Sequence, residues 1–247
     1  MQSSFVWLLG ACFATSLLAS GCASDGSSDD ELDESDQTAA KAPRIGAYFM
    51  EGTDMTAANN GIIHRLSKKT AGSPVVVRSR YFQGPSILCT GDTDDWLSCP
   101  NRTETLVKAI CDDFKAKRID AFVVFGYSRG AFIANKAAQM VRSRCEADTK
   151  KYLYAGFLDG VQMSWYLSDD SRVPKYTKWH HVHRKDTDSW IYPVTKFWGY
   201  RVNGELNGVN ESGPDTDHPG MGIDPDMLTK MAKEANRRSG YKIFPGY

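Results

Sequence analysis

Ala121-Phe122-Val123-Val124-Phe125, followed by Gly126-Tyr127-Ser128-Arg129-Gly130, is the strongest indication of the fold in this sequence. Its first five residues are apolar without interruption, which is typical of a β-strand covered on both faces. A helix is predicted from Gly130 to Arg144, because small and apolar residues recur there at helical spacing. The stretch therefore predicts a buried strand that passes through a glycine-flanked turn directly into a helix.

The segments on either side alternate between strand and helix patterns. Strands are predicted for Arg44–Phe49, Val75–Phe82, Tyr152–Leu158 and Lys178–His183, with a further extended stretch at Phe197–Val202. Helices are predicted for Asn59–Lys69, for the segment that begins at Asn101 with Glu104 three places later, and for Asp226–Arg238. Such alternation favours right-handed crossovers, with helices on both faces of a mostly parallel sheet. The sequence thus predicts one three-layer α/β domain over residues 44–247.

The first residues of the chain resemble an export signal. An apolar run, Phe5–Leu18, is too short to span a bilayer comfortably and leads into Leu18-Ala19-Ser20-Gly21-Cys22. Small residues before a cysteine resemble a bacterial lipobox, which predicts a lipoprotein signal over residues 1–21 and an acylated Cys22. The alternative is an ordinary secretory signal cut near Ala23. Both predict export to the bacterial cell envelope, and the lipobox also predicts a lipid anchor in a membrane.

Residues 22–43 are acidic and almost free of large apolar side chains, so we expect a disordered tether there. The segment holds seven acids and one base, Lys41. Subtracting them from the 30 acidic and 30 basic residues of the chain leaves 23 and 29, a surplus of six positive charges. That surplus favours binding to anionic head groups or acidic substrates. A solvated surface without a partner is an equally good interpretation. No phosphate-binding loop, dinucleotide fingerprint or nucleic-acid module is found, so we expect no nucleic-acid partner.

Six cysteines are present, of which Cys12 lies in the signal and Cys22 at its end. The other four would be in an oxidising compartment after export, where disulfides persist. We favour pairing Cys89 with Cys99 and Cys111 with Cys145, among three possible arrangements. No CxxC spacing occurs, and the Asp-rich loop between Cys89 and Cys99 does not match a calcium-binding loop. We therefore expect neither a metal site nor a cofactor.

The pattern G-x-S-x-G at Gly126–Gly130 has a specific meaning between a buried strand and a helix. A turn this sharp forces the serine into strained backbone angles, and the flanking positions must be glycine to avoid clashes. The hydroxyl of Ser128 would then project above the sheet at the positive end of the helix. The alternative is a glycine-rich turn with an incidental serine.

Gly126-Tyr127-Ser128-Arg129-Gly130-Ala131 is similar to the G-F-S-R-G-A segment of the Tle1-like (DUF2235) group of phospholipase-like proteins. Gly52-Thr53 after the first strand is similar to that group's D-G-T segment, with Glu51 in place of its aspartate. His218-Pro219-Gly220-Met221-Gly222 would correspond to its H-x-D-x-G-G segment. The resemblance implies an α/β-hydrolase-like fold and an esterase or phospholipase activity.

A serine hydroxyl needs a base to act as a nucleophile, usually a histidine that a carboxylate orients. Of the five histidines, His218 is favoured because it follows the last extended stretch and precedes the final helix. His64 precedes the serine and is expected to be structural. The remaining three are expected to be strand residues rather than metal ligands: His180, His181 and His183.

The acid should end a strand between the serine and the histidine. Asp159 fits, because Leu158-Asp159-Gly160 follows a predicted strand, and Asp186 is the rival. The oxyanion would be held by the backbone N–H of Arg129 together with that of Gly52 or Thr53. These residues predict a serine ester hydrolase that forms an acyl-enzyme, with a lipid ester as the preferred substrate. Peptidase and thioesterase chemistry stay open, and the alternative function is an inactive surface binding or scaffold lipoprotein.

Overall fold

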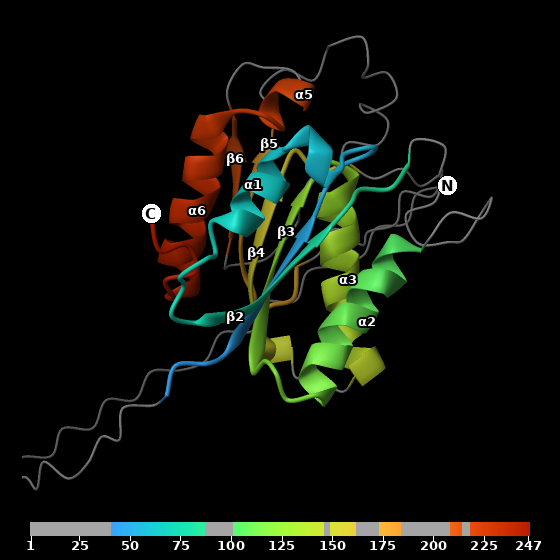
Figure 1. Cartoon of the computed structure of the whole chain (residues 1–247), viewed down its shortest axis with the longest axis vertical. Coiled ribbons are helices and arrows are strands. Elements are labelled where there is room, and N and C mark those ends of the chain that lie inside the picture. The colour runs from blue at the N-terminus through green and yellow to red at the C-terminus, as the bar shows by residue number, and fades with distance from the viewer. Residues whose placement is uncertain (1–40, 87–100, 146–148, 162–172, 184–207, 214–217) are drawn as a thin grey trace, which may run out of the picture. The chain divides into compact units, whose positions relative to one another are not determined.

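The apolar run Ala121–Phe125 lies in strand β3 (Ala121–Tyr127), in which every residue is buried. The computed structural model describes residues 41–86, 101–145, 149–161, 173–183, 208–213 and 218–247 (Figure 1). Residues Lys41–Tyr247 form one compact unit. Within this unit Phe122 and Val124 belong to one core cluster and Val123 and Phe125 to the other, so the uninterrupted apolar pattern of β3 reflects burial on both faces of the sheet.

The described strands form one sheet in the order β2-β1-β3-β4-β5-β6, and each pairing between neighbours is parallel. The other members are β1 (Ile45–Met50), β2 (Val76–Phe82), β4 (Tyr152–Leu158), β5 (Lys178–His183) and β6 (Gly208–Ser212). The predicted α/β class and the mostly parallel sheet are confirmed.

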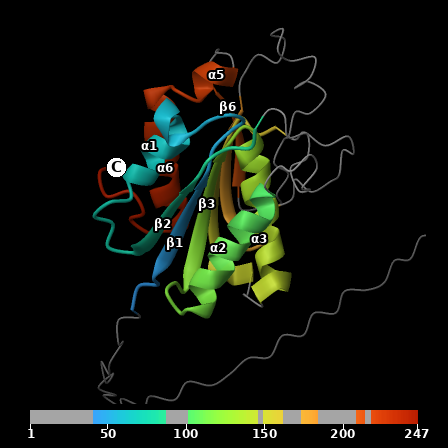
Figure 2. The same cartoon turned by 45° about the vertical axis from the view of Figure 1, so that its right-hand side comes forward.

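Helices cover both faces of this sheet, as Figures 1 and 2 show. One face carries α2 (Arg102–Lys115) and α3 (Arg129–Cys145), whose apolar side chains share one core cluster with the sheet. The other face carries α1 (Ile62–Lys68) and α6 (Pro225–Ser239), which share the second cluster. The three layers are therefore confirmed. No helix among the described residues is both long enough and apolar enough to cross a membrane.

The ends of two helices follow from their capping residues. The side chain of Asn101 accepts a hydrogen bond from the Glu104 backbone N–H at 2.9 Å, as its position in the sequence predicts. At α6, Asp224 is the N-cap and accepts from the Asp226 N–H at 2.7 Å. Pro225 then occupies the first turn, where no backbone N–H is needed. The helix therefore begins one residue before the predicted Asp226.

Two elements differ from the sequence-based predictions. Helix α1 begins at Ile62 instead of Asn59, because Asn60 adopts a left-handed backbone with φ of 51° that a helix cannot continue through. Before it, Ala57–Asn59 form only a short 3-10 turn, η1. Strand β6 at Gly208–Ser212 was not predicted, since it contains a single large apolar residue, Val209. The predicted stretch Phe197–Val202 lies outside the described residues.

A disulfide joins the two helices on one face of the sheet. Cys111 on α2 and Cys145 at the end of α3 are bonded, with their Cα atoms 5.4 Å apart. This pairing was predicted from the sequence and is confirmed. Cys89 and Cys99, the other predicted pair, lie outside the described residues, as does Cys22.

The double substitution C111S/C145S is expected to lower the free energy of unfolding by about 2–4 kcal/mol, because the bond closes a loop of 34 residues in the unfolded chain. Urea unfolding of the oxidised proteins, followed by tryptophan fluorescence, measures the difference. In excess reductant the two proteins should unfold at similar midpoints, since reduction removes the bond from the wild type as well. Equal midpoints without reductant would contradict a stabilising role for this disulfide.

Candidate active site

The strand order reverses direction between β1 and β3. From β1 the chain crosses outward to β2, and from β3 it crosses the other way to β4. Loops that leave the carboxyl ends of two such strands diverge, so a crevice forms between them, and ligands of open parallel sheets bind at this point. In this chain the two loops begin at Glu51 and Ser128.

Ser128 occupies the turn between β3 and α3 in a left-handed conformation, with φ of 55°. Both flanking glycines are required by close contacts. A Cβ atom on Gly130 would lie 2.3 Å from the carbonyl oxygens of Met50 and Glu51, and one on Gly126 would lie 2.5 Å from the Cα of Ala131. The glycines therefore permit a sharp turn that presses the start of α3 against the end of β1.

Hydrogen bonds hold the serine backbone in this strained position. Its N–H donates to the Leu158 carbonyl of β4 at 3.0 Å, and its own carbonyl accepts from the N–H groups of Ala131 and Val161. A non-glycine residue with positive φ persists only where its surroundings fix it. Ser128 is thus held by hydrogen bonds to β4 and to the first turn of α3, and 4% of its surface is exposed. We call the turn from β3 through Ser128 into α3 the elbow.

Three side chains that the sequence singled out meet at this turn. The Nε2 atom of His218 lies 2.7 Å from the Oγ of Ser128, and its Nδ1 atom lies 2.5 Å from the Oδ2 of Asp159. Both the aspartate and histidine side chains are mostly buried, at 6% and 14% exposure. The arrangement forms a continuous line of hydrogen bonds from a hydroxyl through an imidazole to a carboxylate.

Asp159 reaches this line from the carboxyl end of β4. Its backbone is left-handed, with φ of 40°, and its N–H donates to the Val182 carbonyl of β5 at 2.7 Å. The next N–H, that of Gly160, donates to the Nε2 atom of the fully buried His181 at 3.1 Å. His181 therefore supports the turn that carries the carboxylate. The sequence suggested only a strand residue there. The rival acid, Asp186, lies outside the described residues.

Tyr127 positions the histidine. His218 is the first residue of a short helix, α5 (His218–Met221). The Tyr127 hydroxyl donates to the His218 carbonyl at 2.5 Å, and the two rings stack with centroids 4.9 Å apart. Gly222 allows this contact, since a Cβ there would lie 2.8 Å from the tyrosine ring. Sequence reasoning missed Tyr127 because it stands at a variable position of the G-x-S-x-G pattern.

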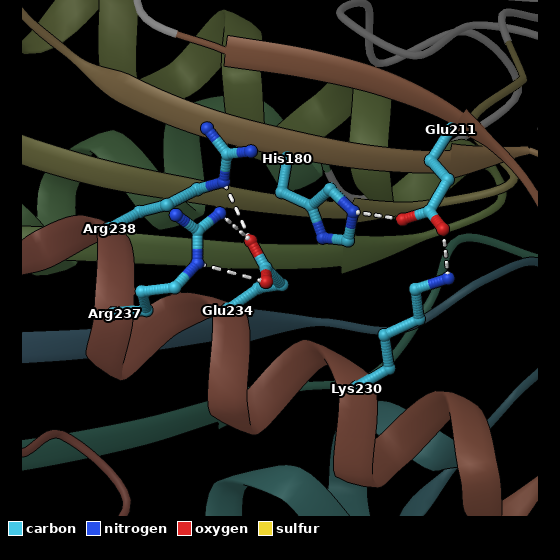
Figure 3. A network of polar contacts seen from close by, with 6 residues as sticks. All are labelled: His180, Glu211, Lys230, Glu234, Arg237 and Arg238. Atoms are coloured by element: carbon cyan, nitrogen blue, oxygen red, sulfur yellow. Dashed lines mark hydrogen bonds and ion pairs between the residues drawn. The ribbon is translucent and has the colours of Figure 1, made fainter.

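His180 lies on the α6 side of the sheet, where Figure 3 shows it beside Glu211 and the charged side chains of α6. Its Nε2 atom lies 3.0 Å from a Glu211 carboxylate oxygen, and the other oxygen pairs with Lys230. Burial lowers the pKa of His180, although Glu211 counteracts this effect. Beside it, Glu234 is bound by Arg237 and Arg238, and the Arg237 hydrogen bonds lower the Glu234 pKa to about 2. This histidine is therefore part of a polar network that joins β5 and β6 to α6.

The loop after β1 lies against the serine. A Cβ on Gly52 would be 2.9 Å from the Cβ of Ser128, and one on Gly84 would be 1.5 Å from the Gly52 carbonyl oxygen. Gly52 is thus enclosed between the elbow and the loop after β2. Its N–H is directed toward the Glu51 carboxylate, at 3.4 Å. The N–H of Thr53 has no hydrogen-bond acceptor among the described residues.

Arg129, the residue after the serine, is fully buried. One of its guanidinium nitrogens donates to the Ser86 carbonyl at 3.3 Å, in the segment that follows β2. The backbone of Arg129 opens α3, and the partial positive charge of a helix N-terminus is concentrated there. The arginine therefore connects the elbow to the segment that covers Gly52.

Glu51 ties this loop to α1. Its side chain is fully buried, and Oε1 accepts from the His64 N–H at 2.9 Å, in the first turn of a helix whose N-cap, Gly61, has no side chain. Burial raises the Glu51 pKa, while the N–H groups of His64, Gly52 and Ile63 reduce that shift. The carboxylate thus caps α1 from a distance, a role that the sequence analysis did not anticipate.

The same turn of α1 also holds the segment that follows His218. The Ile62 N–H donates to the Gly222 carbonyl at 2.8 Å, and the Arg65 guanidinium donates to the Ile223 carbonyl at 2.7 Å. Through Glu51 on one side and these carbonyls on the other, the start of α1 links the Gly52 loop to the histidine helix.

The chain resembles known proteins in structure but not in sequence. No protein-family model matches it, and no curated protein matches it. The RedJ thioesterase from the prodiginine pathway of Streptomyces coelicolor is 14% identical, with a TM-score of 0.43 over 78% of this chain and 90% of RedJ. The NocB thioesterase domain of the nocardicin cluster is 13% identical, with a TM-score of 0.48 over 81% of this chain and 95% of that domain. A variant of SOBER1 from Arabidopsis thaliana is 13% identical, with a TM-score of 0.43 over 78% of this chain and 99% of SOBER1. Likeness at this level says nothing about substrate.

Removal of the Glu51 carboxylate by Glu51→Ala is expected to destabilise the fold by about 1–3 kcal/mol, because buried donors at the start of α1 lose their acceptor. Glu51→Gln is the matched control, since it keeps the size and one acceptor oxygen, and should cost less. Urea unfolding at neutral pH measures both values. Equal losses in the two variants would contradict the capping role.

The raised pKa of Glu51 also predicts a pH effect. Because the folded chain holds this proton more tightly than the unfolded chain, the contribution to stability is full below the unfolded pKa. It is then lost as the pH rises through the folded pKa. Glu51→Gln should remove this component when the unfolding free energy is compared between about pH 4 and pH 8. Parallel pH curves for wild type and variant would be incompatible with it.

Proposed function

We propose that this chain is a serine hydrolase that cleaves carboxylic esters through an acyl-enzyme, with Ser128 as nucleophile, His218 as base and Asp159 as the orienting acid. The observation that supports it is the line of hydrogen bonds from Ser128 through His218 to Asp159. Hydroxyl, imidazole and carboxylate in this order activate a nucleophile, whatever fold carries them. The chain order Ser, Asp, His is also the one that α/β-hydrolases use.

The first half of the reaction transfers the acyl group to the enzyme. His218 Nε2 takes the proton of the Ser128 hydroxyl as Oγ bonds to the ester carbonyl carbon, and the carbonyl electrons move to its oxygen. The tetrahedral species collapses when the carbon–oxygen bond to the alcohol breaks. The departing alcohol takes the proton from His218, and the acyl group stays on Ser128. Asp159 holds the imidazole in the required tautomer and balances its transient charge.

The second half returns the enzyme to its initial state. Water gives a proton to His218 as its oxygen bonds to the acyl carbon, and collapse of the second tetrahedral species breaks the bond to Ser128. The serine regains its proton from His218, and a carboxylic acid leaves. The same imidazole therefore acts alternately as base and acid.

We assign the oxyanion hole to the backbone N–H groups of Arg129 and Thr53. Between the two N–H groups considered in the loop after β1, that of Gly52 is directed to its neighbouring carboxylate. The Thr53 N–H has no acceptor among the described residues. Fixed donors at the place where negative charge develops are commonly the largest catalytic contribution, often about 2.7–4 kcal/mol for one donor. The Gly84 contact that holds Gly52 in place would keep the loop preorganised.

A lipid ester is the proposed substrate class, and the exported, lipid-anchored form is the proposed location. Both rest on the Cys22 pattern and on the resemblance of the Ser128 segment to phospholipase-like proteins. The disulfide between Cys111 and Cys145 supports export, because such bonds persist in oxidising compartments and are rare in the cytosol. Thioesters and peptides would use the same groups, so the substrate test includes an acyl thioester.

Hydrolysis of p-nitrophenyl esters of increasing acyl length, and of an acyl thioester, tests the proposal. Ser128→Ala and His218→Ala should each lower kcat by about 10⁴-fold or more, and Asp159→Asn should also cause a large loss, because all three act as one unit. His180→Gln is the matched histidine control and should retain activity, since His180 belongs to the α6 network. A preference for long acyl chains would support the lipid substrate.

Folded wild-type protein without activity on any of these substrates would favour the inactive binding or scaffold protein. Activity that survives Ser128→Ala would refute the acyl-enzyme mechanism.

A further inference from the structure

The segments that lead into the strands gather at one edge of the sheet, because all described pairings are parallel. Within the described residues these segments are rich in bases. We call the following residues the cationic edge: Lys41, Arg44, Lys68, Lys69, Lys117, Arg118, Lys150, Lys151, Lys175 and Lys178. The same segments contain one carboxylate, Asp120, which pairs with Arg44. Arg118 is bound by the buried Asp113. Glu146 and Asp148, just before β4, lie outside the described residues and leave a large surplus of bases.

Helix dipoles explain only part of this surplus. Bases stabilise the carboxyl ends of helices, which accounts for Lys68 at the end of α1. Lys117 follows α2 in a left-handed turn, Lys175 lies in a loop, and Lys178 is the first residue of β5. All three are exposed and outside any α-helix. Helix ends therefore do not account for the bases at these three positions.

The opposite edge, where Ser128 lies, has the reverse character. Its described loops carry Asp54 and Asp224 together with the buried Glu51 and Asp159. Among the described loops, bases thus gather where the strands begin and acids where they end. Such a separation orients a protein in front of a charged surface.

An aromatic residue stands within the cationic edge. Tyr176 is 57% exposed, and the Lys150 ammonium lies 5.7 Å from the centre of its ring. Tyrosine is enriched where an apolar phase meets water, since its ring enters the interface while its hydroxyl stays hydrated. An exposed tyrosine among lysines is therefore suited to the head-group region of a membrane.

We propose that the cationic edge binds the anionic head groups of a membrane. The chain itself favours a lipid surface over other polyanions, because it enters β1 at this edge and Cys22, the predicted lipid attachment residue, precedes Arg44 by 22 positions. The disordered tether that the sequence predicts there would reach on the order of 25 Å, so the edge would stay within range of the surface. This argument rests on the proposed lipid anchor and not on the proposed hydrolase activity.

Docked in this way, the protein directs its active-site end away from the anchoring surface. Strand β3 has seven residues, which separate the two edges by roughly 20 Å. Ser128 would then meet substrate that arrives from the side opposite the anchor, either free in solution or in another membrane.

Flotation of the full-length chain with vesicles tests the proposal. One set of vesicles is phosphatidylcholine alone, and the other contains phosphatidylglycerol as the anionic lipid. Wild type should bind the anionic vesicles more, and salt should weaken the difference. Lys117→Glu/Lys178→Glu should lower the excess binding by at least about tenfold, because each base contributes separately near a charged surface. Tyr176→Ala should lower it further.

Arg102→Glu/Lys233→Glu is the matched control, with the same change of net charge on α2 and α6 but outside the cationic edge. It should retain binding within about twofold. Hydrolysis of a soluble ester separates this proposal from the proposed function, since the edge variants should keep wild-type activity. Equal binding to both vesicle types, or equal losses in test and control variants, would overturn the proposal. Binding to duplex DNA is measured in parallel. If Lys117→Glu/Lys178→Glu lost DNA binding but kept its binding to anionic vesicles, the edge would be assigned to nucleic acid instead.

Discussion

The candidate site is organised around the left-handed backbone of Ser128. A serine with φ of 55° is strained, and it is kept so by contacts that leave no room for a Cβ on Gly130. Those contacts are with the carbonyls that end β1, so the turn that exposes the hydroxyl also fixes β1 against α3. The nucleophile and the loop beside it are therefore positioned by one and the same packing arrangement.

The start of α1 extends this arrangement to the histidine. Glu51 caps the helix from the end of β1, and Ile62 holds the carbonyl of Gly222, four residues after His218. Tyr127 completes the connection, because it is the last residue of β3 and its hydroxyl donates a hydrogen bond to the His218 carbonyl. The components of the site thus come from distant parts of the chain, yet each is anchored to a strand end or to the first turn of a helix.

Local sequence predicted those features that depend on local chemistry. The buried strand, the glycine-flanked turn and the Asn101 cap follow from neighbouring residues, and all are present in the structure. Features that depend on distant partners were missed. His180 meets Glu211 across 31 residues and His181 supports Gly160 across 21, and no spacing in the sequence signals either contact. Strand β6 was missed because an edge strand needs few apolar residues, and Gly208 is there to admit the Trp179 ring.

Reaction with a fluorophosphonate is the most direct test of an activated serine, because the reagent bonds much faster to a hydroxyl whose proton a base removes than to an ordinary hydroxyl. Intact-mass and peptide mass spectrometry should find one adduct per chain, on Ser128, formed much more slowly when His218 is replaced by alanine. Adduct formation at the same rate without His218, or no adduct on the folded wild-type chain, would contradict the account.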